Sequence, residues 1–92
     1  MKYFEFDEHE YWALVVAESK EKACEIYAEE VAYDSVEQVK EAGKPKEIYR
    51  IGALKKYIAA VIKESEGVSD EEIKETFDSF ENTTILITSE LA

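Results

Sequence analysis

The stretch from Lys2 to Ala17, KYFEFDEHEYWALVVA, constrains the fold more than any other part of this chain. It reads as a short apolar strand, an acidic turn, and a second, longer apolar strand that begins at Tyr11. The second strand is an almost unbroken apolar run. Such a run is typical of a central strand buried on both faces, or on one face with aromatic cover on the other. We therefore expect a β-hairpin around which the rest of the chain packs.

Four segments downstream carry the apolar spacing of amphipathic helices. They span residues 20–33, 36–42, 53–64 and 70–81. Ser19, Ser35 and Ser69 stand where N-caps are expected, and the last two have Gln or Glu three positions later, as in a capping box. The segment KEIYRI, residues 46–51, fits either a short strand or an extended linker. The β-branched run from Thr83 to Thr88 predicts a last strand.

The order of these elements is β-β-α-α-(β)-α-α-β, so strands and helices come in runs rather than in strict alternation. This order predicts an α+β fold. We expect a small antiparallel sheet, made of the N-terminal hairpin and the C-terminal strand, with helices packed on one face. The 92 residues have the size of one domain, and no internal repeat or composition shift divides them. We predict a single acidic α+β domain over residues 1–92.

Net charge and cysteine usage limit the partners and the compartment. The 11 basic and 22 acidic residues give a formal net charge of −11, which argues against direct binding to nucleic acid or to an anionic membrane surface. The single cysteine, Cys24, cannot form an internal disulfide and favours a reducing compartment. Because we find neither a signal peptide nor an apolar run of membrane length, we expect a cytoplasmic protein.

The acidic excess lies towards the two ends of the chain. Residues 1–33 hold nine acids against three lysines, a balance of −6, and residues 68–92 hold seven acids against one lysine, again −6. The middle, residues 34–67, has seven basic residues against six acids, a balance of +1. If the last strand pairs with the hairpin, we expect the two acidic segments to meet on one surface.

Such a surface would present carboxylates to a positively charged groove and imitate the spacing of phosphates. Carboxylates and phosphates are both acceptors for arginine and lysine. The candidate partner-binding residues are Asp7, Glu8 and Glu10 in the turn and Asp70, Glu71, Glu72, Glu75 and Asp78 in the last helix. The alternative is that these acids are only the solvated surface of a turn and a helix, since the helix dipole favours acids at an N-terminus. Both interpretations are open.

Motifs for catalysis and metal binding give little support for an enzyme. His9 stands among acids, but no HxH, HExxH or second ligand cluster accompanies it, and the alternative is an exposed turn residue. Cys24 falls on the apolar stripe of its helix, so we expect it in the core. The three glycines stand at segment boundaries, not in a phosphate-binding loop. A pair of catalytic carboxylates is neither excluded nor located by this sequence. We predict no enzyme activity, no cofactor and no metal.

Aromatic residues crowd the hairpin. Alternation along the strand places Tyr3 and Glu5 on one face and Phe4 and Phe6 on the other. One face must be core, and the second is either covered by helices or exposed as an aromatic surface for a protein partner or a second copy. The exposed case gives an alternative function, a housekeeping interaction module or homodimer that uses the aromatic hairpin face.

Several segments resemble proteins of phages and mobile elements. The start, Met1-Lys2-Tyr3-Phe4-Glu5-Phe6, with the strand Tyr11-Trp12-Ala13-Leu14 and the helix from Ala23 to Val31, resembles small acidic proteins of unassigned function in phages and mobile elements of Gram-positive bacteria. The ending Thr88-Ser89-Glu90-Leu91 resembles the tail of a Cas9 inhibitor, and the chain is similar to anti-CRISPR proteins in size, acidity and α+β make-up.

The resemblance implies a non-enzymatic inhibitor that acts in the cytoplasm of a bacterial host cell. Its partner would be a basic nucleic-acid-binding protein, such as a Cas9-like nuclease, blocked by steric cover and DNA mimicry. We expect the inhibitor to bind neither nucleic acid nor membrane directly, and to be a monomer or a homodimer.

Overall fold

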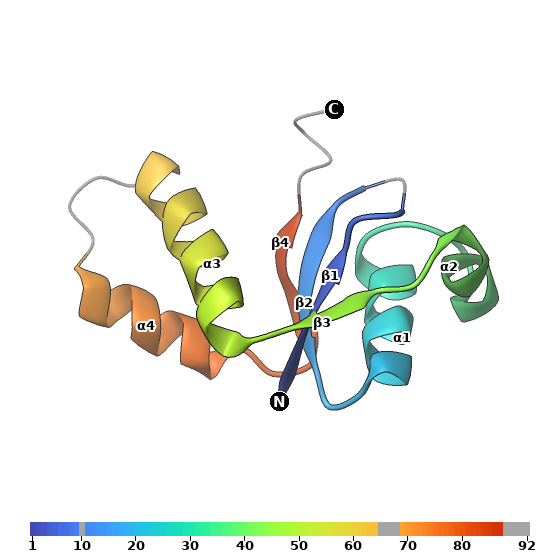
Figure 1. Ribbon diagram of the computed structural model, residues 1–92, viewed down its shortest axis with the longest axis horizontal. Coiled ribbons are helices and arrows are strands. Elements are labelled where there is room, and N and C mark those ends of the chain that lie inside the picture. Colours follow the sequence, from blue (N-terminus) through green and yellow to red (C-terminus); the bar gives the residue numbers. More distant parts are fainter. Residues whose placement is uncertain (10, 65–68, 88–92) are drawn as a thin grey trace.

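The computed structural model describes residues 1–9, 11–64 and 69–87, which form one antiparallel sheet and four helices (Figure 1). The strands are β1 (Lys2–Phe6), β2 (Ala13–Ala17), β3 (Lys46–Ile48) and β4 (Thr83–Ile87). The helices are α1 (Lys20–Glu30), α2 (Val36–Ala42), α3 (Arg50–Glu64) and α4 (Asp70–Ser79). The predicted α+β class and order of elements are confirmed. Among the described residues, no helix is long and apolar enough to cross a membrane.

The hairpin lies at the centre of the sheet, whose strand order is β3-β1-β2-β4. β1 and β2 pair antiparallel with Phe4 opposite Val15, and β3 pairs with β1 through Tyr3 opposite Ile48. β4 pairs with β2, with a shift of register after Leu14. The expected joining of the last strand to the hairpin is therefore confirmed, and the ambiguous KEIYRI segment contributes an edge strand.

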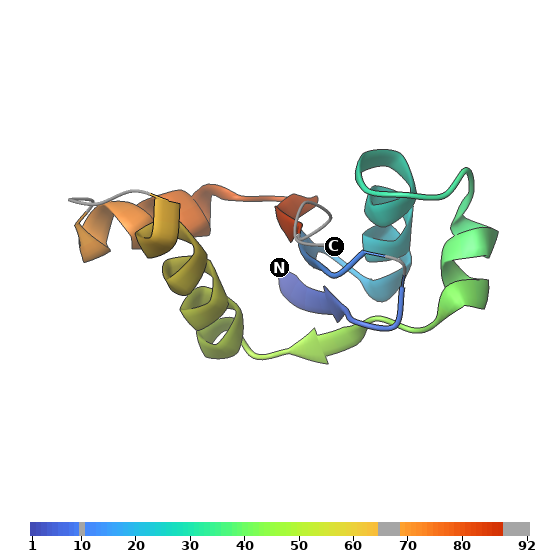
Figure 2. The ribbon, with the colours of Figure 1, turned by 90° about the horizontal axis from the view of Figure 1, so that it is seen from above.

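Helices cover both faces of this sheet (Figure 2). α1 and α2 pack on the face that carries Phe4 and Phe6, whereas α3 and α4 pack on the face that carries Tyr3 and Leu14. All five residues of β2 are apolar and buried, so neither face of this strand can be left to water. The expectation that all helices pack on one face of the sheet was wrong.

The larger buried cluster lies between the sheet and α1. It consists of Phe4, Phe6, Ala13, Val15, Ala17, Ala23, Cys24, Ile26, Tyr27 and Val39. Phe6 and Tyr27 stack with their ring centroids 4.5 Å apart, and the Tyr27 hydroxyl donates to the carbonyl of Tyr11 at 2.6 Å. α1 and α2 begin as predicted, because the hydroxyls of Ser19 and Ser35 each accept a first-turn backbone N–H.

The second cluster lies between the sheet and α3 and α4, and fewer of its described residues are fully enclosed. Its buried members are Leu14, Ala53, Leu54 and Phe77. Tyr3 stacks on Phe77 with centroids 5.2 Å apart. On the same face, Glu5 accepts from the indole N–H of Trp12 at 2.7 Å and lies 3.5 Å from the Lys56 ammonium. Both faces of the hairpin are covered, so it does not present the open aromatic face that the alternative function requires.

The two edges of the sheet differ. At the β4 edge, a carboxylate oxygen of Glu30 in α1 accepts from the backbone N–H of Thr84 at 2.9 Å and from the hydroxyl of Thr83 at 3.3 Å. At the opposite border, β3 has no further strand beyond it in the described part of the chain (Figure 2). An acceptor placed on an edge N–H hinders pairing with another strand, so Glu30 protects one border of the sheet.

Candidate interaction surfaces

Two of the predicted acids, Asp7 and Glu8, are held against the segment that leads from α2 into β3. We name them the turn acids. Asp7 pairs with the Lys46 ammonium at 3.0 Å, and this hydrogen bond raises the pKa of Lys46. Glu8 accepts from the backbone N–H of Lys44 at 3.2 Å, and a Cβ on Gly43 would lie 2.7 Å from the Cβ of Glu8. The turn acids thus join two distant parts of the chain. Glu10, the third acid predicted for the turn, lies outside the described residues.

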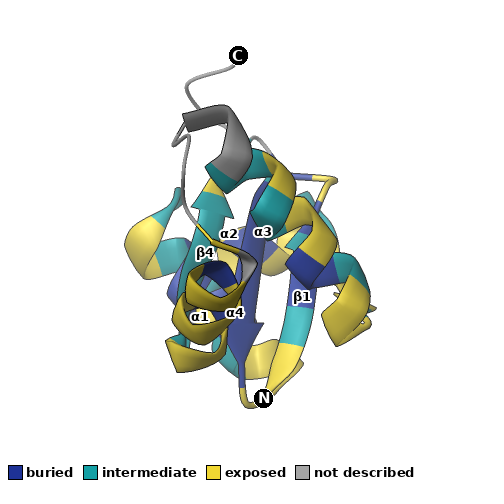
Figure 3. Cartoon of the chain, turned by 90° about the vertical axis from the view of Figure 1, so that its left-hand side faces the viewer, coloured by how far each residue is buried: buried dark blue, intermediate teal, exposed yellow. Residues whose placement is uncertain are grey.

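A second set of predicted acids lies on α4 and faces solvent. We name Glu71, Glu72, Glu75 and Asp78 the α4 acids. Every α4 side chain that the structure describes is exposed, except those of Ile73 and Phe77 (Figure 3). The serine cap predicted for this helix is confirmed, because the Ser69 hydroxyl accepts the N–H of Glu72 at 3.2 Å. The side chain of Asp70 lies outside the part of the chain that the structure describes.

The α4 acids include one that is bound to the neighbouring helix. The guanidinium of Arg50, in the first turn of α3, donates to the carboxylate of Asp78, and this hydrogen bond raises the pKa of Arg50. Arg50 also lies over the ring of Phe77, 5.6 Å from its centroid. The pair is exposed, so its contribution to stability is small. Its consequence is geometric, because it places the end of α4 beside the start of α3.

The turn acids and the α4 acids do not form one surface. The turn lies on the side of α2, whereas α4 lies with α3 at the other end of the molecule (Figures 1 and 2). β4 pairs with β2 as expected, but Phe77 of α4 stacks on Tyr3, at the end of β1 that is farther from the turn. The expectation that strand pairing would bring the two acidic segments together was wrong.

His9 is buried, so it is not the exposed turn residue that its acidic surroundings suggested. It is 8% exposed, and its Nε2–H donates to the carbonyl of Val39 in α2 at 2.7 Å. Its ring lies among those of Phe6, Tyr27 and Tyr33, and its Nδ1 has no hydrogen-bond partner in the described part of the chain. No group of three or more potential metal ligands occurs among the described residues. His9 closes the turn onto α2.

A groove of about 310 Å³ runs between α1 and the loop that follows α2, and Lys20, Lys40 and Lys44 are among its lining residues. The Lys40 ammonium pairs with Glu21 at 2.7 Å, and this hydrogen bond raises the pKa of Lys40. Cys24 also lines the groove. Its burial raises the pKa of the thiol, and the negative charge of Glu21 adds to the effect. A thiol that stays protonated is a poor nucleophile, which agrees with the core role predicted for Cys24.

Comparison with known proteins identifies the family of this chain. A family model described as the YosH C-terminal domain matches residues 1–87, the span that contains every helix and strand of the structure. The chain belongs to the YosH C-terminal domain family. No match was found among the curated proteins or the solved structures. The family description states no activity, so the resemblance to anti-CRISPR proteins stays a prediction. The segment from Thr88 to Leu91, which carries part of that resemblance, lies outside the described residues.

The start of α3, which no sequence motif marks, exposes two large apolar side chains, Tyr49 and Ile51. Because residues 46–51 were expected to form a strand or linker, the helix was predicted to begin at Ala53 rather than at Arg50. One local signal was available. The other three helices follow a serine cap, and no capping residue stands before Arg50.

Proposed function

We propose that this chain is a non-enzymatic binding module that presents the α4 acids to a basic surface of a nucleic-acid-binding protein. The observation that carries the proposal is an exposed acidic helix at one end of a chain whose net charge is −11. Glu71, Glu75 and Asp78 follow one another at helical spacing, on the side opposite to the buried Ile73 and Phe77. Carboxylates in such a row offer acceptors to lysine and arginine and steer a cationic partner towards the helix.

The proposal rests on Glu71, Glu72 and Glu75, because Asp78 is bound to Arg50 and the turn acids are also engaged within the fold. Asp7 is bound to Lys46, and Glu8 is bound to the backbone of Lys44. The mode of action that we propose is to cover the partner's nucleic-acid site, with carboxylates in the place of phosphates. The resemblance to anti-CRISPR proteins suggests a Cas-type nuclease as the partner. Binding should weaken as salt rises, since exposed charges are screened over about 10 Å at 0.1 M ionic strength.

The test compares two charge reversals of equal size. One variant combines Glu71→Lys with Glu75→Lys on α4. The control combines Glu25→Lys with Glu29→Lys, which has the same spacing on the exposed side of α1. Each protein is immobilised and offered a bacterial lysate at low and at high salt. Each is also added to a DNA cleavage reaction of a purified Cas9-type nuclease.

The expected result is specific to α4. The wild-type chain and the α1 variant should retain basic nucleic-acid-binding proteins at low salt and release them at high salt, whereas the α4 variant should retain none. Equal retention by both variants, or retention that salt does not change, would contradict the proposal. The cleavage reaction tests the nuclease target. Cleavage that the wild-type chain does not slow would rule that target out.

A further inference from the structure

The groove between α1 and the loop that follows α2 has a charge opposite to that of the whole chain. Its charged lining residues are Lys20, Lys40, Lys44 and Glu21. Three lysines against one acid give the groove a balance of +2, whereas the chain carries −11. The lysines come from three segments, since one begins α1, one lies in the last turn of α2 and one follows the end of α2. A concave site lined mainly by one sign of charge concentrates ligands of the opposite sign.

The three lysines of the groove differ in whether an acid already binds them. The ammonium of Lys40 is paired with the carboxylate of Glu21 at 2.7 Å, which joins α2 to α1. Lys20 and Lys44 form no ion pair with any residue that the structure describes. Two ammonium groups of the groove are therefore available to a ligand.

Cys24 shows that the charges from the two helices reach the same place. It is 2% exposed and lines the groove. Burial and the charge of Glu21 raise the pKa of its thiol, and the positive charges of Lys40 and Lys20 oppose this rise. Both ammonium groups thus lie near one sulfur atom, although they come from different helices. Pro45, which is buried, adds apolar surface to the lining.

The loop wall of the groove is held in place by the turn acids. Glu8 accepts from the backbone N–H of Lys44 at 3.2 Å, and a Cβ on Gly43 would lie 2.7 Å from the Cβ of Glu8. Asp7 binds the Lys46 ammonium at 3.0 Å. Neither turn acid is a lining residue, so both act on the loop from outside the groove. A wall that is already fixed loses little entropy when a ligand enters.

We propose that this groove binds the phosphate group of a small phosphate monoester. Lys20, Lys40 and Lys44 surround the phosphate, and Cys24 and Pro45 contact the organic part of the ligand. A phosphate monoester carries about 1.5 to 2 negative charges at neutral pH, which matches the balance of +2 in the groove better than the single charge of a carboxylate does. The volume of about 310 Å³ falls in the range of small-molecule sites, so the groove has room for more than a phosphate.

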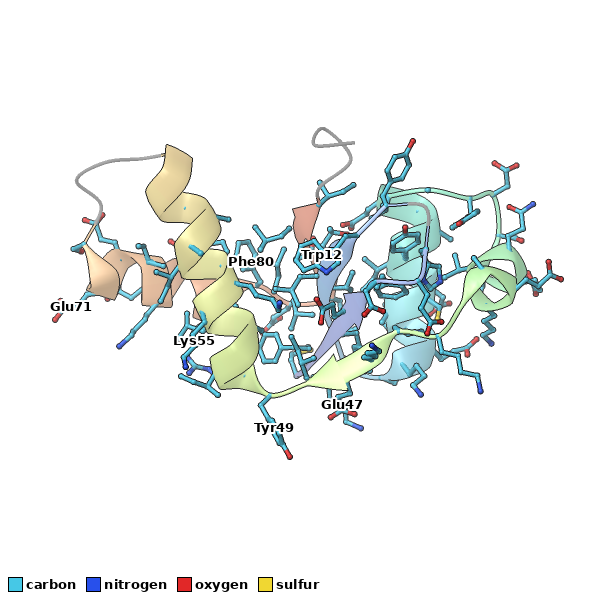
Figure 4. All side chains as sticks on the ribbon, turned by 45° about the horizontal axis from the view of Figure 1, so that its top comes forward. Trp12, Glu47, Tyr49, Lys55, Glu71 and Phe80 are labelled. Atoms are coloured by element: carbon cyan, nitrogen blue, oxygen red, sulfur yellow. The ribbon has the colours of Figure 1, made fainter. Side chains whose placement is uncertain are left out.

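This binding site is separate from the acidic surface of the proposed function. Lys55 on α3 and Glu71 on α4 lie at the end of the molecule opposite to α1 and α2 (Figure 4). The groove therefore does not depend on the basic partner that we propose for the α4 acids. The same separation makes Lys55 suitable for a control variant.

A matched pair of ligands tests the selection of phosphate. Glycerol phosphate carries the monoester, and glycerate carries a carboxylate on the same three-carbon frame. Each is titrated into the isotope-labelled full chain at neutral pH and constant ionic strength, and the amide signals are followed by NMR. We expect saturable shifts for glycerol phosphate at residues 20–24 and 40–44. Glycerate should bind about tenfold more weakly or worse, because it offers the lysines less charge and fewer acceptor oxygens.

Two double variants test the lysines. Lys20→Ala with Lys44→Ala should weaken the binding of glycerol phosphate about tenfold or more, since it removes two charged donors and leaves the backbone of the loop intact. The control is Lys55→Ala with Lys74→Ala, which changes the net charge equally at two exposed lysines outside the groove. The control should bind as the wild-type chain does. Equal urea midpoints of the two variants would show that the fold is retained in both.

Glu21→Gln should act in the opposite direction. It removes a negative charge from the groove and releases the ammonium of Lys40, so binding should become about two- to fivefold tighter. The proposal is overturned if glycerate binds as tightly as glycerol phosphate, if the shifts do not saturate, or if the two double lysine variants behave alike. Weaker binding by the Glu21→Gln variant would also overturn it, because the charge of the groove would then not decide binding.

Discussion

The molecule has two halves, one on each face of the sheet. They differ in how their helices are capped and in how many of their large side chains are buried. On the α1 and α2 side, both helices have serine caps, the rings of Phe6 and Tyr27 are enclosed, and His9 is buried in the turn. On the α3 and α4 side, α3 has no such cap, and Tyr49 and Ile51 project into solvent. The comparison indicates that more residues of the first half are enclosed in a core, and the exposed acids of α4 support the binding role that we propose for the second half.

The largest expected effect comes from removing one buried aromatic ring from each of the two core clusters. Phe6→Ala removes an enclosed ring from the larger cluster and should lower the free energy of unfolding by about 3–5 kcal/mol. Phe77→Ala also removes a buried ring, but we expect a smaller loss, with local opening of α3 and α4. Urea denaturation measures the stabilities, and amide hydrogen exchange locates the opening. Equal loss of protection throughout the chain in both variants would remove the distinction between the halves.

A smaller effect is expected at His9, which stabilises the α1 and α2 half from the turn. His9→Ala removes the donor to the Val39 carbonyl and leaves a gap among Phe6, Tyr27 and Tyr33. We expect a loss of about 2–3 kcal/mol, from an unpaired buried acceptor together with a cavity. His9→Gln keeps an N–H donor and should lose less. Thermal unfolding of the two variants measures the difference, and a His9→Ala variant as stable as the wild type would contradict the role of His9 in closing the turn.

The protected edge of the sheet gives the next prediction. Glu30→Ala frees the backbone N–H of Thr84, so we expect a loss of about 1 kcal/mol and association that grows with protein concentration. The control is Glu29→Ala, which removes a neighbouring exposed acid. Urea midpoints and light scattering compare the two proteins. If they behave alike, Glu30 does not protect the β4 edge.

The smallest expected effect is a gain in stability rather than a loss, at Gly52 in the first turn of α3. Gly52→Ala should raise the free energy of unfolding by about 0.5–1 kcal/mol, since alanine is the better helix former and its Cβ has room. Urea denaturation measures the change. A loss of stability would show that the fold requires glycine at position 52.

Local signals predicted most helices and strands because the interactions that form them are local. A serine cap uses the N–H of a residue in the next turn, so Ser19, Ser35 and Ser69 could be identified from the sequence. The start of α3 was expected at Ala53 rather than at Arg50, because no cap marks it and Gly52 reads as a boundary.

The sequence by itself determined that the hairpin would be central, because the apolar run of β2 must be kept from water. It also determined the chain's charge and the acids of α4. Only the tertiary structure decided that the helices divide between two faces, that His9 reaches Val39, 30 positions later, and that the two acidic segments lie apart. The physical reason is that each of these depends on packing between distant segments, which no local spacing of residues specifies.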